Sequence, residues 1–258
     1  MAPTRSVAAN QRSAMNEPSL PSVTSPPLGR ISRSLLAQQV ADRIVEAMAT
    51  GAIRPGQRVT DFDIASQFGV SRNPVREAMK MLEAQGIIVS NPHRSNHVVA
   101  FDRKKVEQIA TLRVAIEKIA FADAAQSYAA DPSLLRELDK IIETMDECAR
   151  RHDLNGITKA DLAFHRAVCL ASKNEIVLTV WETLARHMRI SFNLEIREDT
   201  DPPEDIPGHH RALREALATG DRSCAESEIE NHILRLQRRR FRGSSTKFTT
   251  SDGPDLLP

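Results

Sequence analysis

From Asp102 onward the chain is a succession of long helical segments with no convincing strand pattern, and this constrains the fold more than any other feature. Apolar residues recur there three or four positions apart, as in helices that bury one face. One such stripe consists of Leu135, Leu138, Ile142 and Met145, and another of Phe164, Val168 and Ala171. We expect helices at about 102–128, 131–151, 154–171, 174–198, 205–219 and 221–242. Residues 101–243 are therefore predicted to form an all-α domain.

The preceding region, residues 31–100, contains shorter elements. The pattern predicts a helix over 33–49, a second from the N-cap Thr60 to Phe68, and a third from Ser71 to about Gln85. Two short β-branched runs, at 87–89 and 97–100, flank a polar loop and read as a two-stranded wing. Three helices followed by a hairpin are the layout of a winged helix-turn-helix, so we expect a mainly α protein with this domain in front.

The third helix of the front region carries the residues expected to contact DNA. Arg72 and Arg76 are four apart and share one helix face. A guanidinium can bond guanine with two hydrogen bonds, and Ser71 and Asn73 are placed to bond phosphates or bases. The predicted core of this domain comprises Ile64, Ala65, Phe68, Val75, Met79 and Leu82. On charge and periodicity alone, a small helical domain with solvated arginines explains the pattern equally well.

Charge is distributed unevenly along a chain whose net charge is only +1. Residues 31–100 hold 8 Lys and Arg against 6 Asp and Glu, whereas residues 101–230 hold 18 against 25. DNA contact is therefore expected from the front domain. The tails, 1–30 and 244–258, have the composition of disordered segments. Three cysteines without paired spacing and no membrane-length apolar run favour a cytoplasmic protein with no membrane partner.

One set of polar residues in the helical domain has the chemistry of a metal site. Asp161 and His165 lie four apart on one predicted helix, and His210 and His232 lie on the last two helices. A carboxylate and three imidazoles can bind Zn²⁺, Ni²⁺ or Mn²⁺ and leave positions open for ligand oxygens. Spacing alone also fits unrelated histidines, and His187 is a rival ligand.

The front region resembles the GntR family of bacterial winged-helix regulators. The resemblance rests on Gly-x-x-x-Pro-Gly at 51–56 followed by Ser-Arg-x-Pro-Val-Arg-Glu-Ala at 71–78. It implies binding to double-stranded DNA at a pseudo-palindromic operator. The implied DNA contacts are Ser71, Arg72, Asn73, Arg76, Arg94 and Ser95. The family usually has glycine at the wing tip, where this chain reads His93-Arg94-Ser95.

Residues 102–242 resemble the ligand-binding domain of the FadR subfamily, of the FCD type. The matching pieces include Leu112-Arg113 with Glu117, Asp161 with His165, Asn174, His210 and His232. The resemblance implies an antiparallel helical bundle in which Asp161, His165, His210 and His232 bind a divalent metal. It also implies that Arg113 faces a small organic-acid effector. A salt bridge to Glu117, four residues on, is an equal alternative for Arg113.

Together these features predict a homodimeric transcriptional regulator, a repressor rather than an activator, whose operator binding responds to a carboxylate. Two alternatives stay open at this point. The metal site can activate water in a hydrolase-type enzyme, although no acid or base partner is evident in the sequence. The metal can also be purely structural, with the effector bound elsewhere.

Overall fold

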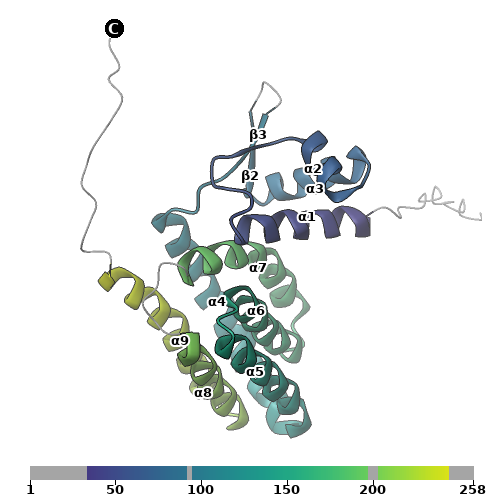
Figure 1. Cartoon of the computed structure of the whole chain (residues 1–258). Coiled ribbons are helices and arrows are strands. Elements are labelled where there is room, and N and C mark those ends of the chain that lie inside the picture. The colour runs from purple at the N-terminus through teal and green to yellow at the C-terminus, as the bar shows by residue number, and fades with distance from the viewer. Residues whose placement is uncertain (1–33, 92–94, 197–202, 244–258) are drawn as a thin grey trace, which may run out of the picture. The chain divides into compact units, whose positions relative to one another are not determined.

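The computed structural model describes residues 34–91, 95–196 and 203–243 (Figure 1). The two tails expected to be disordered lie outside these residues, as does Arg94. Most of the described chain is helical, with one small sheet, as the sequence predicts. No described helix is long and apolar enough to cross a membrane.

The front domain contains three helices and a small antiparallel sheet. The helices are α1 (Ser34–Ala49), α2 (Asp61–Phe68) and α3 (Arg72–Ala84), and the strands are β1 (Arg58–Val59), β2 (Ile88–Asn91) and β3 (Ser95–Val98). The strand order is β1-β3-β2. The predicted two-stranded wing is confirmed as the β2–β3 hairpin, and β1 adds a third strand that the sequence analysis did not predict. Two residues are too few to show a strand periodicity, and β1 exists because Arg58 and Val59 pair with His97 and Asn96 of β3.

Local chemistry accounts for the turn between α2 and α3. Thr60 accepts a hydrogen bond from the backbone N–H of Asp63 at 3.1 Å, which is the predicted N-cap. Gly69 ends α2 with φ at 65°, a left-handed conformation that suits a residue without Cβ. Ser71 occupies the N-cap position of α3 but makes no side-chain capping bond. The predicted core is confirmed, with Val75 and Leu82 fully buried and Phe68 partly buried.

The remaining elements form an antiparallel helical bundle (Figure 1). Its helices are α4 (Arg103–Ala130), α5 (Leu135–Arg150), α6 (Leu154–Ala171), α7 (Glu175–Ile196), α8 (Ile206–Ala218) and α9 (Arg222–Gly243), with short 3₁₀ turns at η1 (Pro132–Leu134) and η2 (Pro203–Asp205). Helix α4 packs against α6, α7, α8 and α9, so it is central to the bundle. Both predicted apolar stripes contribute to its core, in which Leu138, Met145 and Phe164 are fully buried.

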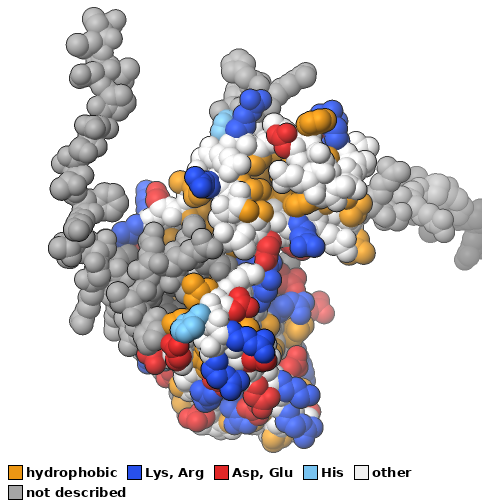
Figure 2. Space-filling view, in the orientation of Figure 1, with side chains coloured by type: hydrophobic (Ala, Val, Ile, Leu, Met, Phe, Trp, Pro, Cys, Tyr) orange, Lys and Arg blue, Asp and Glu red, His pale blue; other side chains and the backbone are white. Residues whose placement is uncertain are grey.

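Exposed charged side chains are frequent on the helices of the bundle. Figure 2 shows Lys and Arg interspersed with Asp and Glu over the visible face of the helices. Several of these make exposed ion pairs, such as Arg166 with Glu182 at 2.7 Å. Exposed pairs of this kind contribute little to stability because water and salt screen them. The stability of the bundle therefore comes mainly from its buried apolar faces.

Candidate metal centre and nucleic-acid interface

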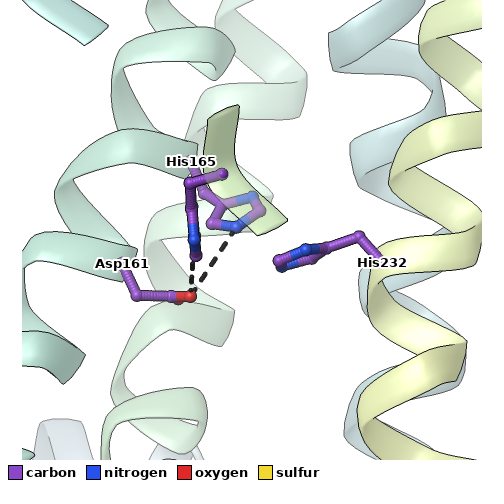
Figure 3. A group of neighbouring side chains, drawn as sticks. Asp161, His165 and His232 are labelled. Carbon is purple, nitrogen blue, oxygen red and sulfur yellow. Dashed lines mark ion pairs between the residues drawn. The ribbon is translucent and has the colours of Figure 1, made fainter. Parts of the chain in front are cut away.

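The bundle brings the four predicted ligand residues together. Asp161 and His165 are one turn apart on α6, His210 projects from α8, and His232 from α9. One ligand atom from each lies within 4.8 Å of the others, and all four residues are buried. In Figure 3, His232 points from its helix toward Asp161 and His165 on the opposite side. The cluster therefore joins α6 to the last two helices of the described chain, α8 and α9.

The contacts within the cluster orient its nitrogen atoms. His210 Nδ1 donates a hydrogen bond to the carbonyl oxygen of Ile206 at 2.9 Å. That bond leaves the lone pair of His210 Nε2 facing Asp161 Oδ1, 3.0 Å away. Two acceptor atoms at this distance require a cation or a proton between them. The lone pairs of His210 Nε2 and Asp161 Oδ1 are thus placed to bind one cation together, as a metal site requires.

Orphaned polar atoms give a second test of whether a metal fits. Asp161 Oδ2 and His232 Nε2 are buried and have no hydrogen-bond partner among the described residues. Burial, together with positive charge on neighbouring groups, holds the pKa of His232 well below its usual range. His232 is therefore neutral at pH 7, which is the form that binds metals. The donor set of one carboxylate and three imidazoles fits a divalent transition metal.

Arg113 of α4 lies beside this cluster and is almost fully buried. Its Nε donates to Glu117 Oε1 at 2.7 Å, which confirms the salt bridge that the sequence allowed. The other end of the guanidinium faces the cluster, with Nη2 2.7 Å from His165 Nε2. The ring of Phe192 lies 5.0 Å from the guanidinium carbon. The salt bridge and an orientation toward the cluster therefore coexist.

Glu117 is held by more than Arg113. Trp181 of α7 donates its indole N–H to Glu117 Oε1 at 2.9 Å, and His165 Nδ1 lies 2.7 Å from Glu117 Oε2. Burial opposes ionisation of Glu117, but the charge of Arg113 and the contact with His165 outweigh it and lower the pKa to about 2. The sequence analysis did not identify Trp181 as a partner, although its being the only tryptophan was an available signal.

His187, the rival ligand, lies outside the cluster. Its Nε2 donates to the carbonyl oxygen of Gln85 at 2.9 Å, and its ring is 6.1 Å from that of Phe101. Gln85 caps the C-terminal end of α3. His187 therefore links α7 to the C-terminal end of α3 and is not among the grouped ligands.

The candidate DNA contacts form an exposed group at the start of α3. Ser71, Arg72, Asn73 and Arg76 are all exposed, and Ser95 is the first residue of β3. Both arginines bond to one carboxylate, with Arg72 Nη2 2.9 Å and Arg76 Nε 2.6 Å from oxygens of Asp61. The sequence analysis missed Asp61. An acidic residue at the start of the helix that precedes the paired arginines was the only local signal.

Comparison with known sequences and structures defines the class of protein. Residues 36–98 match the family described as "Bacterial regulatory proteins, gntR family", and residues 108–235 match the "FCD domain". The "Probable D-xylose utilization operon transcriptional repressor" of Paenarthrobacter nicotinovorans is 32% identical over 204 residues, which are 79% of this chain and 88% of that one. The chain is thus a transcriptional regulator with a helix-turn-helix DNA-binding domain.

More distant relatives agree with this class. The "Gluconate operon transcriptional repressor" of Bacillus subtilis (strain 168) is 26% identical over 211 residues, covering 80% of this chain and 86% of its own. The solved structure of E. coli McbR/YncC has the same fold, with a TM-score of 0.70 at 22% identity over 83% of this chain and 99% of that chain. The chain belongs to the GntR family and carries a C-terminal FCD domain.

Proposed function

We propose that this regulator represses transcription by binding an operator, and that a small carboxylate bound beside a divalent metal releases it. Operator contact is assigned to the start of α3 and to the wing, through Ser71, Arg72, Asn73, Arg76, Arg94 and Ser95. The metal is assigned to Asp161, His165, His210 and His232. Repression is proposed because the two relatives named above are described as repressors.

The observation that carries the proposal is a buried metal-ligand set with a guanidinium at its side. When bound, a divalent metal supplies an electrophilic centre for carboxylate oxygens. Arg113 supplies a planar donor suited to the same group, and its Nη2 is 3.8 Å from Asp161 Oδ2. Metal and guanidinium together select a carboxylate. Because one relative is named for a gluconate operon, sugar acids are the first carboxylates to test.

Contacts between the two domains provide a route for control. Helix α6 carries Asp161 and His165, and its Lys159 pairs with Glu46 of α1 at 3.0 Å. The Asn155 amide of α6 donates to the same carboxylate at 2.9 Å. A carboxylate that shifts α6 would therefore disturb the support of the DNA-binding domain. Only an effector with different affinity for two arrangements can act in this way.

A homodimer is part of the proposal because two recognition helices read two half-sites of a pseudo-palindrome. The bundle offers exposed apolar side chains for such an interface. They are Leu112 and Ile119 on α4, Leu170 on α6, and Ile176 and Val180 on α7. Large apolar side chains grouped on neighbouring helices are typical of surfaces that pair.

The test measures operator and random-duplex affinity for the wild type and for Arg72→Ala, Arg76→Ala and the double variant. Each lost guanine contact is expected to cost about 1–3 kcal/mol of discrimination, or roughly 5- to 150-fold. Lys80→Ala, which removes one exposed positive charge further along α3, is the matched control. An unchanged preference for the operator in the double variant contradicts the assignment.

Metal and effector are tested with His165→Ala. We expect reduced metal content, no thermal shift with sugar acids or dicarboxylates, and operator binding that no longer responds to them. Wild-type metal occupancy in this variant contradicts the ligand set. Chelation that unfolds the bundle, without any carboxylate effect on DNA binding, favours a structural metal. Metal-dependent hydrolysis without operator binding favours an enzyme.

A further inference from the structure

Glu117 is a fully buried carboxylate in the middle of α4 with three neighbours from three helices. Arg113 Nε and Trp181 Nε1 both donate to its Oε1, at 2.7 Å and 2.9 Å. Its Oε2 lies 2.7 Å from His165 Nδ1. The two oxygens of Glu117 therefore have different partners. Oε1 accepts two hydrogen bonds, and Oε2 lies against the imidazole of His165.

The contact decides which nitrogen of His165 carries the proton. A carboxylate only accepts hydrogen bonds, so His165 Nδ1 must be protonated to bond Glu117. Arg113 Nη2, which can only donate, lies 2.7 Å from His165 Nε2, so Nε2 has a lone pair and the ring proton is on Nδ1. With that proton on Nδ1, the lone pair of Nε2 accepts from Arg113 Nη2, and Asp161 Oδ1 lies 3.9 Å from the same nitrogen. His210 shows the same arrangement, with Ile206 as its acceptor.

We propose that Glu117 is a positioning residue that fixes His165 in the Nδ1–H tautomer and so aims Nε2 into the cluster. Arg113 and Trp181 support Glu117 in turn, because their hydrogen bonds occupy Oε1 and leave only Oε2 for His165. The link to metal affinity rests on the proposed function, whereas the tautomer itself does not. An outer carboxylate of this kind typically changes metal affinity by 10- to 100-fold when it is lost.

A purely structural role, as the buried counter-ion of Arg113, predicts something different. In that case Glu117 affects stability, while the proton on His165 is distributed without regard to it. Arg113 Nη2 donates toward His165 Nε2 and favours the same tautomer in the wild type. The tautomer of His165 in a Glu117 variant therefore separates the two roles, because a purely structural Glu117 would leave the proton on Nδ1 when it is replaced.

The variant Glu117→Gln distinguishes the positioning role from the structural role, because its amide group can have only one of two orientations. Arg113 and Trp181 both donate to the Oε1 position, so the amide oxygen takes that position. The amide NH₂ then faces His165 Nδ1 and can only donate to it. We expect the ring proton to move to Nε2, which ends the contact of that nitrogen with Arg113 Nη2 and blocks it for a metal.

The experiment records long-range ¹H–¹⁵N spectra of the histidine rings in the metal-free, full-length protein at neutral pH. Wild-type His165 is expected as the Nδ1–H tautomer, and Glu117→Gln as Nε2–H. Competition titrations with Zn²⁺ and Ni²⁺ are expected to show affinity reduced by about 10- to 100-fold in the variant. Glu182→Gln, which removes the exposed partner of Arg166, is the matched control and should change neither.

An Nε2–H tautomer in the wild type overturns the proposal, and this measurement does not require the variant to fold. So does a Glu117→Gln protein with unchanged tautomer and unchanged metal affinity. If the wild type binds neither metal, the metal centre of the proposed function fails. The tautomers of the wild type and the variant then decide the role of Glu117 independently.

Discussion

The carboxylate of Asp61, at the first position of α2, binds the guanidinium of Arg72, at the first position of α3. Arg72 Nη2 lies 2.9 Å from Oδ1 and Nε lies 3.2 Å from Oδ2. Arg76 joins the same carboxylate through its Nε. The two arginines are therefore held side by side before any DNA is present, with half of their joint charge neutralised.

Asp61→Asn is expected to weaken operator discrimination. Less negative charge near the DNA raises affinity for random duplex, while the arginines lose the group that aligns them. A fall of about fivefold to tenfold in the ratio of operator to random affinity corresponds to roughly 1 kcal/mol. Fluorescence anisotropy with both duplexes measures the ratio. Asp63→Asn is the control, because Asp63 bonds Thr60 and not the arginines; an equal effect in both variants would mean that charge alone matters.

Asp61 also predicts a pH dependence. The hydrogen bond from Arg72, together with that from Arg76 and their charges, lowers the pKa of Asp61 below its ordinary 3.8, although partial burial opposes this. Because the folded-state pKa is the lower one, the stabilising contribution is complete above the unfolded pKa and disappears as pH falls through the folded pKa. A ¹³C titration of the carboxyl should show a midpoint below 3.8 that rises in Arg72→Ala. A midpoint that Arg72→Ala leaves unchanged would contradict the pairing.

Two glycines near α8 should respond in opposite ways to alanine. Gly220 has φ at 71°, and a Cβ there would lie 2.8 Å from Cβ of Ala129. Gly220→Ala is therefore expected to destabilise the protein by more than about 1 kcal/mol. Gly208 is inside α8, where a Cβ meets nothing within 4 Å, so Gly208→Ala should stabilise by about 0.5–1 kcal/mol. Urea unfolding of both variants checks the contrast, and equal changes in stability would argue against it.

The proposed dimer predicts the effect of a charge on the apolar surface. Ile176 is 75% exposed near the start of α7. Burying an introduced charge is costly, so Ile176→Lys should shift the protein toward monomer and weaken operator binding. Sedimentation velocity across a concentration series measures the change. Thr144→Lys, at an exposed position of α5, is a control because that helix carries none of the apolar residues of that surface. A wild-type protein that is monomeric at all concentrations would refute the dimer.

Much of the fold was predictable from local sequence. The capping contact between Thr60 and Asp63 joins residues three apart, and the apolar stripe through Leu138 and Met145 lies on one helix. Such features depend on short-range geometry that repeats with the helical period. The family resemblance then selected four ligand candidates that spacing alone left ambiguous.

Other features required chain segments to meet in space. The pairing of Arg58 with His97 created a strand too short to show any pattern, and Trp181 reaches Glu117 across 64 positions of sequence. By itself, the amino-acid sequence determined the helices, their apolar faces and the candidate chemistry. Tertiary packing alone decided that Asp61 joins the two arginines and that Glu117 meets His165. The physical reason is that helical periodicity shows which face of a helix is buried, but not which residues of other elements contact that face.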